Sequence, residues 1–458
     1  MKVTVVGSGY VGLVTGVCLA ADGHEVRSVD VQADRIDAIN RCAPPFYEPG
    51  LPELLRSVTQ SGRFSGTTDL ARAVREAEVV IIAVGTPTRG GRIDLTALEG
   101  ALQSIGQILA CCEDRKTVVM KSTVVPGTTD TLARSILECA SGKNAGQGFG
   151  LAMNPEFLRE GSAVQDFRNP DRIVIGSWDD ASARAMDALY AGYSCPRVHT
   201  TPRNAELAKY TANALLGTLI SFSNEVAAIC ESVPGTDVQT VMEALHLDRR
   251  LSPVLEGVVV RPQVLTYLAA GAGFGGSCLP KDIAALLHFG AENGVAMPLL
   301  RSVLDVNLAR PAKLAEMLRR ELGALNDKKI ALLGLAFKPG TDDLRESPAL
   351  RLAAVLLQER AELFAVDPFA ASYTQGSVDS RIRTAVDPRE AFRGADAIVL
   401  VTAWPQFIEW NWETLVALMR TPVVLDGRNA LHGVRMPADT RYRCIGTAES
   451  PREPASVG

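Results

Sequence analysis

A glycine-rich turn near the N-terminus is the first segment with residues that could do chemistry. The pattern GxGxxG at residues 7–12 follows an expected buried strand at residues 2–6 and opens an expected helix. Such a turn lets the backbone approach a diphosphate at the positive end of a helix. Asp30, at the end of the next expected strand, suits a ribose 2′-hydroxyl and would repel a 2′-phosphate. The sequence therefore predicts an NAD site with the residues Gly7, Gly9, Tyr10, Val11, Gly12, Asp30 and Arg35.

Three pairs of polar residues are four positions apart, which on a helix would place both side chains on one face. One pair contains a cysteine that follows the turn GFGGS and precedes a proline by two positions. That thiol is expected near a helix N-terminus, where the thiolate is favoured. Isolated pairs more often form a solvated helix face, and most single cysteines are inert buried thiols. The three pairs are Glu156 and Glu160, Lys209 and Asn213, and Cys278 and Asp282.

Two further polar segments, at residues 85–88 and 121–123, each follow an expected strand. The carboxyl ends of parallel strands are where ligands bind in such sheets. Taken alone, each segment could equally be a turn capped by a hydroxyl group, so the residues leave both interpretations open. Thr86 and Thr123 are the candidate ligand-binding residues of these segments.

The elements that must position these residues alternate between strands and helices. Short β-branched runs at 79–84, 117–122 and 172–176 are typical of buried parallel strands, and this alternation predicts a doubly wound α/β sheet. Residues 203–232 contain no proline and one glycine, which predicts one long helix. Its wide apolar surface favours a dimer contact, although a core helix within one subunit explains it nearly as well.

A second α/β unit opens at Lys329 and repeats the first in outline. Residues 73–87 align without gaps on 391–405, and the acid-ended strand 25–30 has a counterpart at 362–367. We therefore predict two Rossmann-like domains with doubly wound parallel sheets, joined by a central helical region with a long helix. The expected boundaries are 1–200 for an NAD-binding domain, 201–310 for a helical dimerisation region, 311–446 for a C-terminal Rossmann-like domain and 447–458 for a flexible tail.

Composition narrows the classes of function. The 458 residues include 47 Lys and Arg against 52 Asp and Glu, a net charge of −5, so no basic field is available for nucleic acid. Nine cysteines without zinc-type spacing and five scattered histidines argue against a metal site or a disulfide scaffold and favour the reducing cytosol. The sequence contains no uninterrupted apolar run of about 18 residues, so we expect no membrane span. We expect a cytoplasmic protein with no metal, nucleic-acid or membrane partner.

Seven motifs resemble those of the nucleotide-sugar 6-dehydrogenases, the UDP-glucose/GDP-mannose dehydrogenase family. In order, they are GSGYVG, VGTPT, KSTVVPGTT, NPEFLREGSAVQDF, NPDRIVIG, GFGGSCLPKD and FKPGTDDLRESPA, and the resemblance covers roughly residues 1–445. It implies two successive oxidations of the sugar C6, from alcohol to acid, with two NAD⁺ per turnover. It also implies UDP-glucose as the first expected substrate, with UDP-glucuronate as product, and a homodimer or higher homo-oligomer.

The resemblance implies a catalytic role for each member of the polar pairs except Glu160. Cys278 is expected to capture the aldehyde intermediate as a thiohemiacetal, which then becomes a thioester. Lys209 and Asn213 are expected to stabilise the developing oxyanion. Asp282, with Thr123 and a water, is expected to handle the proton.

The same resemblance assigns the remaining site residues. Glu156 is expected to assist hydrolysis of the thioester. Additional cofactor-side residues are Thr86, Thr123, Glu160, Lys281 and Arg345. The substrate-binding set is Phe157, Leu158, Lys209, Tyr267, Leu268, Gly275, Lys338 and Arg428, of which the last two match cations that hold a diphosphate.

Other functions remain open alternatives on the residues. The same chemistry could act on dTDP-glucose or GDP-mannose, because LPKD after Cys278 also occurs in the GDP-mannose type, whereas NPDR favours the UDP-glucose type. A one-step hydroxyacid dehydrogenase would use Lys209 and Asn213 but leave Cys278 idle. A non-enzymatic NAD sensor would have no need for Cys278, Lys209 and Asp282 together. One segment differs from the family pattern, because Pro262 occupies the place of an arginine before the glycine-rich turn.

Overall fold

The computed structural model describes residues 1–370, 373 and 376–448. The chain divides into two compact units, Met1–Ala212 and Asn213–Gly458, and each is described by itself. Residues 449–458 of the predicted flexible tail lie outside the described residues.

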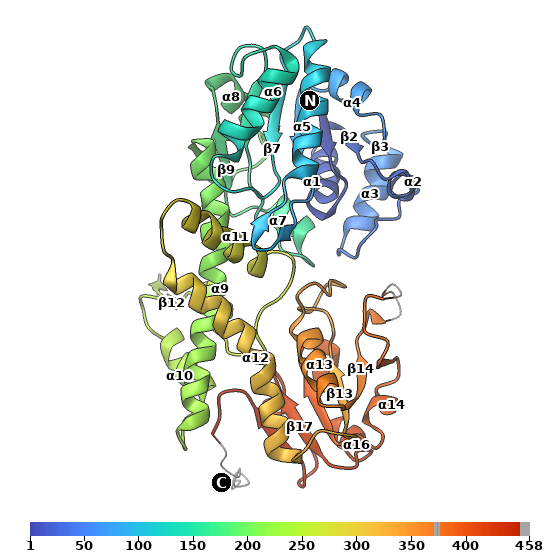
Figure 1. Ribbon diagram of the computed structural model, residues 1–458, viewed down its shortest axis with the longest axis vertical. Coiled ribbons are helices and arrows are strands. Elements are labelled where there is room, and N and C mark those ends of the chain that lie inside the picture. Colours follow the sequence, from blue (N-terminus) through green and yellow to red (C-terminus); the bar gives the residue numbers. More distant parts are fainter. Residues whose placement is uncertain (371–372, 374–375, 449–458) are drawn as a thin grey trace. The chain divides into compact units, whose positions relative to one another are not determined.

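An eight-stranded sheet forms the centre of the first unit (Figure 1). Its strands are β1 (Lys2–Val6), β2 (Glu25–Val29), β3 (Phe64–Thr67), β4 (Val79–Ile82), β7 (Thr117–Met120), β8 (Gly150–Met153), β9 (Ile173–Ser177) and β10 (Arg197–Thr200), while β5 (Thr88–Arg89) and β6 (Arg92–Ile93) form a separate hairpin. The order is β10-β9-β8-β7-β4-β1-β2-β3, so the strands from β3 to β8 have the doubly wound order of dinucleotide-binding folds. This confirms the predicted fold class, with one difference: β9 pairs antiparallel with β8.

Helices bury both faces of this sheet, because its central strands are apolar on both sides. On one face, residues such as Val5 and Ile81 pack against α1, α3, α7 and α8. On the other face, residues such as Ile82 and Met120 pack against α4, α5 and α6. The helices are α1 (Tyr10–Ala21), α2 (Ala33–Asn40), α3 (Leu51–Gln60), α4 (Leu70–Glu76), α5 (Thr96–Ala110), the π-helical turn η1 (Thr128–Ala133), α6 (Arg134–Ser141), α7 (Ala163–Arg168) and α8 (Asp180–Leu189).

The long helix predicted from the sequence is confirmed as α9 (Pro202–Ser232), which contributes residues to both units. By length and composition, it is also the one helix among the described residues that could cross a membrane. Buried polar side chains of this helix form hydrogen bonds to other parts of the protein. Glu206 accepts hydrogen bonds from two backbone N–H groups of the first unit, and Asn224 accepts one from Gly271 in the second.

The second unit contains a six-stranded sheet that repeats the order of the first (Figure 1). Its strands are β13 (Lys329–Leu333), β14 (Glu362–Val366), β15 (Ile382–Ala385), β16 (Ala397–Leu400), β17 (Val423–Asp426) and β18 (Arg441–Cys444). The order β15-β14-β13-β16-β17-β18 is parallel throughout. Helix α13 (Pro348–Gln358) packs on one face, and α14 (Pro388–Phe392), α15 (Pro405–Ile408) and α16 (Trp412–Val416) pack on the other.

The remaining part of the second unit is mainly helical. It consists of α10 (Val238–His246), the hairpin β11 (Val254–Leu255) and β12 (Val258–Val259), the 3₁₀ turn η2 (Gln263–Tyr267), α11 (Leu279–Glu292) and α12 (Pro298–Leu322). The helix α12 runs across the predicted domain boundary at residue 310 and contains Pro311. The predicted domain boundaries therefore stay predictions, with a continuous helix across this one.

The carboxylate of Glu206 joins α9 to the start of η1. Its oxygens accept from the N–H groups of Gly127, at 2.6 Å, and Thr129, at 2.7 Å, and the residue is fully buried. Burial raises the pKa of Glu206 to about 7, against the lowering effect of these hydrogen bonds. The native state therefore keeps a proton that the unfolded chain releases above the ordinary glutamate pKa of 4.5.

We expect Glu206 to make stability depend on pH. Between the unfolded pKa and the folded value of about 7, it should lower the free energy of unfolding by up to about 3 kcal/mol as pH rises, with no further change above that interval. Glu206→Gln should remove this dependence because the amide does not titrate. Urea unfolding of both proteins at about pH 5 and about pH 8 measures the effect, and parallel profiles would contradict it.

Candidate active site

The glycine turn after β1 has the geometry of a diphosphate site. Gly7 has φ +100°, and a Cβ on Gly12 would lie 1.8 Å from the carbonyl oxygen of Gly7, so both positions require glycine. Gly9 is the N-cap of α1, and no atom of the described residues lies within 4 Å of a Cβ built on it. The turn is therefore open where a ligand would approach the N–H groups of the helix end. These residues fit the diphosphate of NAD.

Asp30 closes this turn from the end of β2. Its Oδ2 accepts from the backbone N–H of Ser8 at 2.8 Å and from Nη1 of Arg35 at 3.2 Å, and its Oδ1 accepts from the N–H of Gln32 at 3.0 Å. The carboxylate thus fixes the turn and can still accept from a ribose hydroxyl, because each oxygen has more than one lone pair. Tyr10, beyond the turn, donates its hydroxyl to Glu48.

The two hydroxyl segments that follow β4 and β7 meet in the structure. Thr86 donates from Oγ1 to the carbonyl oxygen of Thr123 at 2.8 Å, and Ser122 donates from Oγ to the carbonyl oxygen of Val84 at 2.7 Å. Both segments lie at the carboxyl edge of the sheet, where ligands bind in this fold. The Thr86 hydroxyl thus satisfies a backbone carbonyl of the neighbouring loop, and its role toward a ligand stays a prediction.

Glu156 and Lys209 form a buried ion pair. Lys209 Nζ lies 2.8 Å from Glu156 Oε1, and Leu158 N donates to Oε2 at 2.6 Å. Burial alone raises the pKa of Glu156, but the charge and hydrogen bond of Lys209 outweigh it and the net pKa is lowered. Glu156 is therefore an anion at neutral pH, held by a cation.

The prediction of a helix with Glu156 and Glu160 on one face is wrong. Residues 154–160 form a loop that precedes α7. The bond from the Leu158 N–H to the Glu156 carboxylate supplies a local alternative to helical hydrogen bonding, and Pro155 lacks an N–H for a helical bond. The two glutamates are thus not related by helical spacing.

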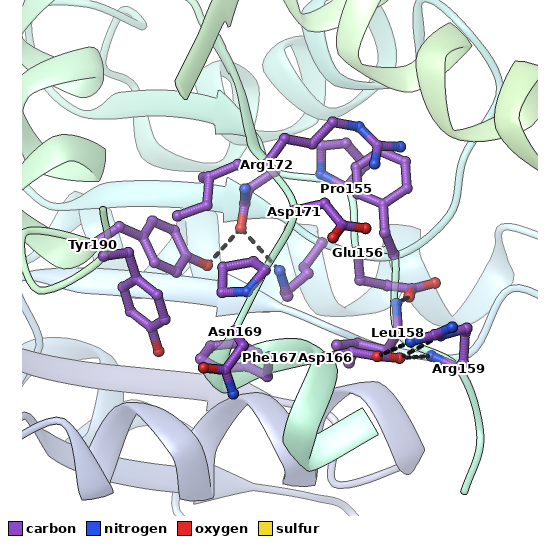
Figure 2. Close-up of a pocket in the computed structure, with 16 residues that line it drawn as sticks. Pro155, Glu156, Leu158, Arg159, Asp166, Phe167, Asn169, Asp171, Arg172 and Tyr190 are labelled. Atoms are coloured by element: carbon purple, nitrogen blue, oxygen red, sulfur yellow. Dashed lines mark hydrogen bonds and ion pairs between the residues drawn. The ribbon is translucent and has the colours of Figure 1, made fainter. Parts of the chain in front are cut away.

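A cavity of about 110 Å³ lies against this loop (Figure 2). On its wall, Lys121 Nζ and the Tyr190 hydroxyl both donate to Asn154 Oδ1, at 2.9 and 2.7 Å. The Arg172 guanidinium lies 3.9 Å from the ring centroid of Phe157. Burial lowers the pKa of Lys121 to about 8, with the charge of Glu156 opposing the shift. These contacts fix the loop that carries the predicted substrate residues Phe157 and Leu158.

The contact between Lys121 and Asn154, which fixes the loop after β8, was not predicted from the sequence. Lys121 ends a buried apolar strand run, and Asn154 follows another such run directly. Polar residues at these two places, on neighbouring strands of one sheet, were the signal that could have predicted their contact.

In the second unit, Cys278 is the N-cap of α11, and the Asp282 N–H donates to the Cys278 carbonyl oxygen at 2.8 Å. The thiol therefore lies at a helix N-terminus, as predicted. The helix dipole favours a thiolate at such a position. Asp282 is fully buried and accepts from Asn213 Nδ2 at 2.6 Å and from Lys281 Nζ at 2.5 Å. The structure thus brings together four residues of the predicted site.

The glycine-rich turn before Cys278 packs against the predicted phosphate-binding residue Arg428. This side chain follows β17 and donates from Nη1 to the Gly273 carbonyl oxygen at 3.0 Å and from Nε to that of Val401 at 2.6 Å. Burial, aided by the charge of Arg310, lowers the pKa of Arg428 to about 10. The guanidinium therefore remains charged at neutral pH.

The other predicted residues of this unit include Gly275, Arg345, Lys338, Tyr267 and Leu268. Gly275 requires glycine, because a Cβ would lie 2.3 Å from the Glu346 carbonyl oxygen. Arg345 pairs with Asp343 at 2.7 Å, and the Lys338 amine lies 5.7 Å from the ring centroid of Phe337. Tyr267 and Leu268 lie at the end of η2, whose N-cap is Pro262.

Three family models match consecutive parts of the chain. They describe the NAD binding domain of the UDP-glucose/GDP-mannose dehydrogenase family at residues 1–194, its central domain at 203–309 and its UDP binding domain at 331–433. The fold and site therefore define an NAD-dependent dehydrogenase that acts on a nucleotide sugar. The chain belongs to the UDP-glucose/GDP-mannose dehydrogenase family.

Individual relatives are similar over most of their length. The UDP-glucose 6-dehydrogenase of Pseudomonas aeruginosa is 39% identical, over 95% of this chain and 95% of that protein. The GDP-mannose 6-dehydrogenase of Pseudomonas putida is 42% identical, over 79% of this chain and 80% of that protein. The structure of a UDP-glucose dehydrogenase from Pyrobaculum islandicum is 36% identical with a TM-score of 0.87, covering 97% of this chain and 98% of that one.

The charge of Asp30 is expected to select the cofactor. NAD⁺ should be preferred to NADP⁺ by at least roughly 2 kcal/mol. With NADP⁺, the carboxylate would lose the hydrogen bond from the ribose 2′-hydroxyl and would repel the 2′-phosphate. Asp30→Asn keeps an oxygen for the Ser8 N–H and removes the charge, so the preference should fall. Ratios of kcat/KM for the two cofactors measure it. Asp34→Asn, an exposed acid in the first turn of α2, is the control, and equal cofactor preference in the unsubstituted protein would contradict the assignment.

Proposed function

We propose that the protein oxidises C6 of UDP-glucose to the carboxylate, giving UDP-glucuronate, in two NAD-dependent steps at one nucleophile. The observation that carries this proposal is Cys278 at the N-terminus of α11 with the buried Asp282 one turn later, where Asp282 accepts hydrogen bonds from Lys281 and from Asn213 of α9. A one-step dehydrogenase has no use for a thiol in that position. The similarity to UDP-glucose 6-dehydrogenases extends over nearly the whole chain, which supports UDP-glucose as substrate.

Cys278 is proposed to hold the intermediate. Bound NAD⁺ supplies the acceptor for the hydride in each oxidation. The thiolate adds to C6 of the aldehyde, so the aldehyde is not released, and the resulting thiohemiacetal is oxidised to a thioester. Water then cleaves the carbon–sulfur bond, which releases the acid and restores the thiol.

The neighbouring polar residues are proposed to manage charge and protons. Lys209 and Asn213, one turn apart on α9, stabilise the developing oxyanion. Asp282, with Thr123 and a water, moves the proton. Glu156 assists hydrolysis of the thioester, and its ion pair with Lys209 holds the two side chains together.

The binding residues are proposed as predicted from the sequence. The cofactor side consists of Gly7, Gly9, Tyr10, Val11, Gly12, Asp30, Arg35, Thr86, Thr123, Glu160, Lys281 and Arg345. The substrate side consists of Phe157, Leu158, Lys209, Tyr267, Leu268, Gly275, Lys338 and Arg428. GDP-mannose is the second candidate substrate, because a GDP-mannose 6-dehydrogenase reaches 42% identity over a shorter part of the chain.

A second copy of the chain is proposed to cover the exposed side of α9. Leu215, Phe222 and Ile229 are seven residues apart and 53%, 47% and 62% exposed, so they form one apolar stripe along the helix. Such a stripe is typical of a helix that packs against a partner. We further propose the cytosol as the location, because all nine cysteines are free thiols.

The stoichiometry tests the function. The unsubstituted protein should form two NADH per UDP-glucose consumed, without free aldehyde, and should act more slowly on GDP-mannose and dTDP-glucose. Cys278→Ala should bind UDP-glucose and complete no net oxidation to the acid. Cys278→Ser should stall after one turnover with the sugar attached, because an oxygen ester hydrolyses less readily than a thioester. NADH absorbance and intact-protein mass spectrometry measure these outcomes.

Exposed cysteines provide the control for this test. Cys111→Ala and Cys139→Ala, both at exposed positions, should keep the ratio of two. A ratio of one in the unsubstituted protein, or acid formation at a near-normal rate by Cys278→Ala, would refute covalent capture at this residue.

The dimer is tested at the centre of the stripe. Phe222→Glu places a charge where an apolar contact is proposed, so the assembly should dissociate toward the 48.9 kDa chain. Sedimentation velocity measures the mass. Val386→Glu adds the same charge at a surface residue that is 86% exposed and should leave the mass unchanged. A monomeric unsubstituted protein would contradict the proposal.

A further inference from the structure

The loop Gly271–Phe274, which ends four residues before Cys278, is held by side chains from α9, α12 and the turn after β17. Asn224 Oδ1, from α9, accepts from the Gly271 N–H at 2.9 Å, and Arg310 Nε, from α12, donates to the Gly271 carbonyl oxygen at 3.0 Å. Arg428 donates to the Gly273 carbonyl oxygen at 3.0 Å. The loop is buried and forms no strand or helix, so these side chains supply the partners that its backbone lacks.

Asn307, also from α12, makes the most specific of these contacts. Its Oδ1 accepts from the Phe274 N–H at 2.7 Å and its Nδ2 donates to the Phe274 carbonyl oxygen at 2.9 Å. One side-chain amide therefore pairs with both polar groups of one residue. The Asn307 side chain is 3% exposed, and a Cβ on Gly273 would lie 2.6 Å from its Oδ1. The loop and the amide leave no room for another arrangement.

The chain between Phe274 and Cys278 is also fixed. Gly276, with φ +82°, donates from its N–H to the Arg345 carbonyl oxygen at 2.8 Å. Gly275 packs so closely that a Cβ would meet the Glu346 backbone. A displacement of the loop therefore reaches the N-cap of α11 without a flexible segment in between.

We propose that Asn224, Asn307 and Arg310 are positioning residues that fix the loop Gly271–Phe274 and thereby the sulfur of Cys278. The inference rests on the proposed role of Cys278 as nucleophile. The three side chains contact the loop backbone and no reacting atom, so they act through it. A nucleophile must approach its carbon within a narrow range of distance and angle, and a shift of about 1 Å can cost roughly 100-fold in rate.

A purely structural role is the alternative, and Ser221 provides its control. This residue is 2% exposed and donates from Oγ to the Val303 carbonyl oxygen at 2.8 Å, so it joins the same two helices without touching the loop. Ser221→Ala removes a buried hydrogen bond between α9 and α12. Asn307→Ala removes two buried hydrogen bonds between α12 and the loop. Only Asn307→Ala should disturb the thiol.

The experiment measures the thiol and the turnover separately. Iodoacetamide labelling of the Cys278 peptide, followed by mass spectrometry across pH, should show a changed rate and a shifted pH midpoint in Asn307→Ala. With UDP-glucose and NAD⁺, kcat should fall by roughly 10- to 100-fold, with KM changed less than about threefold. Ser221→Ala should resemble the unsubstituted protein in both measurements.

A second pair of variants keeps the test decisive if Asn307→Ala does not fold. Arg310→Lys keeps a donor for Gly271 and should retain more turnover than Arg310→Met at similar melting temperature. Labelling and kcat that fall no further in Asn307→Ala or Arg310→Met than in Ser221→Ala would overturn the proposal. Normal acid formation by Cys278→Ala would instead overturn the nucleophile assignment, while the labelling comparison would still report on the position of the thiol.

Discussion

A loop that leaves the carboxyl end of a buried parallel strand carries peptide groups that no neighbouring strand satisfies. An orphaned buried N–H or carbonyl costs about 1–3 kcal/mol, so the sites at these edges depend on side chains that supply partners. After β1 the partner is Asp30, which binds the Ser8 N–H. After β13 it is Asp367, whose Oδ2 accepts from the N–H groups of Leu335 and Ala336. An aspartate that directly follows the second strand of each parallel sheet thus binds the loop after the first strand in both units.

Buried charge imposes the second requirement on the site. A buried ion is tolerated only with a partner, and removal of one partner typically costs about 3–5 kcal/mol. Glu156 has Lys209, and Asp282 has Lys281 and the amide of Asn213. The proposed catalytic carboxylates Glu156 and Asp282 are therefore also bound to partners within the protein. Loss of activity in a variant of these residues is informative only beside a measurement of folding.

The elements that the sequence predicted best are those with strong local signals. The β-branched runs, the proline-free stretch that became α9, and the glycine turns before α1 and α11 each identify one element from adjacent residues. The internal repeat also predicted that the second α/β unit resembles the first, and residues 25–30 and 362–367 do occupy equivalent strands.

Features set by contacts distant in sequence were not predicted. The antiparallel pairing of β9 with β8 could not be predicted, because a short apolar run suits a parallel and an antiparallel strand equally well. The loop at Glu156 depends on the Leu158 N–H and on Lys209, which is far along the chain, and helical spacing says nothing of either. Helix α12 continues through Pro311, although proline usually ends a helix. The partner of Phe274 lies on α12, 33 residues away, so its loop could be recognised only as glycine-rich.

Recognition of the diphosphate and choice of the nucleotide sugar are separate problems for this chain. Two of the N–H groups of Arg428 bind backbone carbonyls, so the guanidinium is rigid before substrate arrives. Its charge, retained despite burial, suits the proposed contact with a diphosphate, whichever base is attached to it. The C6 chemistry is likewise shared by UDP-glucose and GDP-mannose, which agrees with the similar identity of the chain to dehydrogenases of both kinds. The proposed nucleophile, carboxylates and phosphate-binding arginine would serve both substrates, so discrimination between the two falls to residues that contact the base and the sugar hydroxyls.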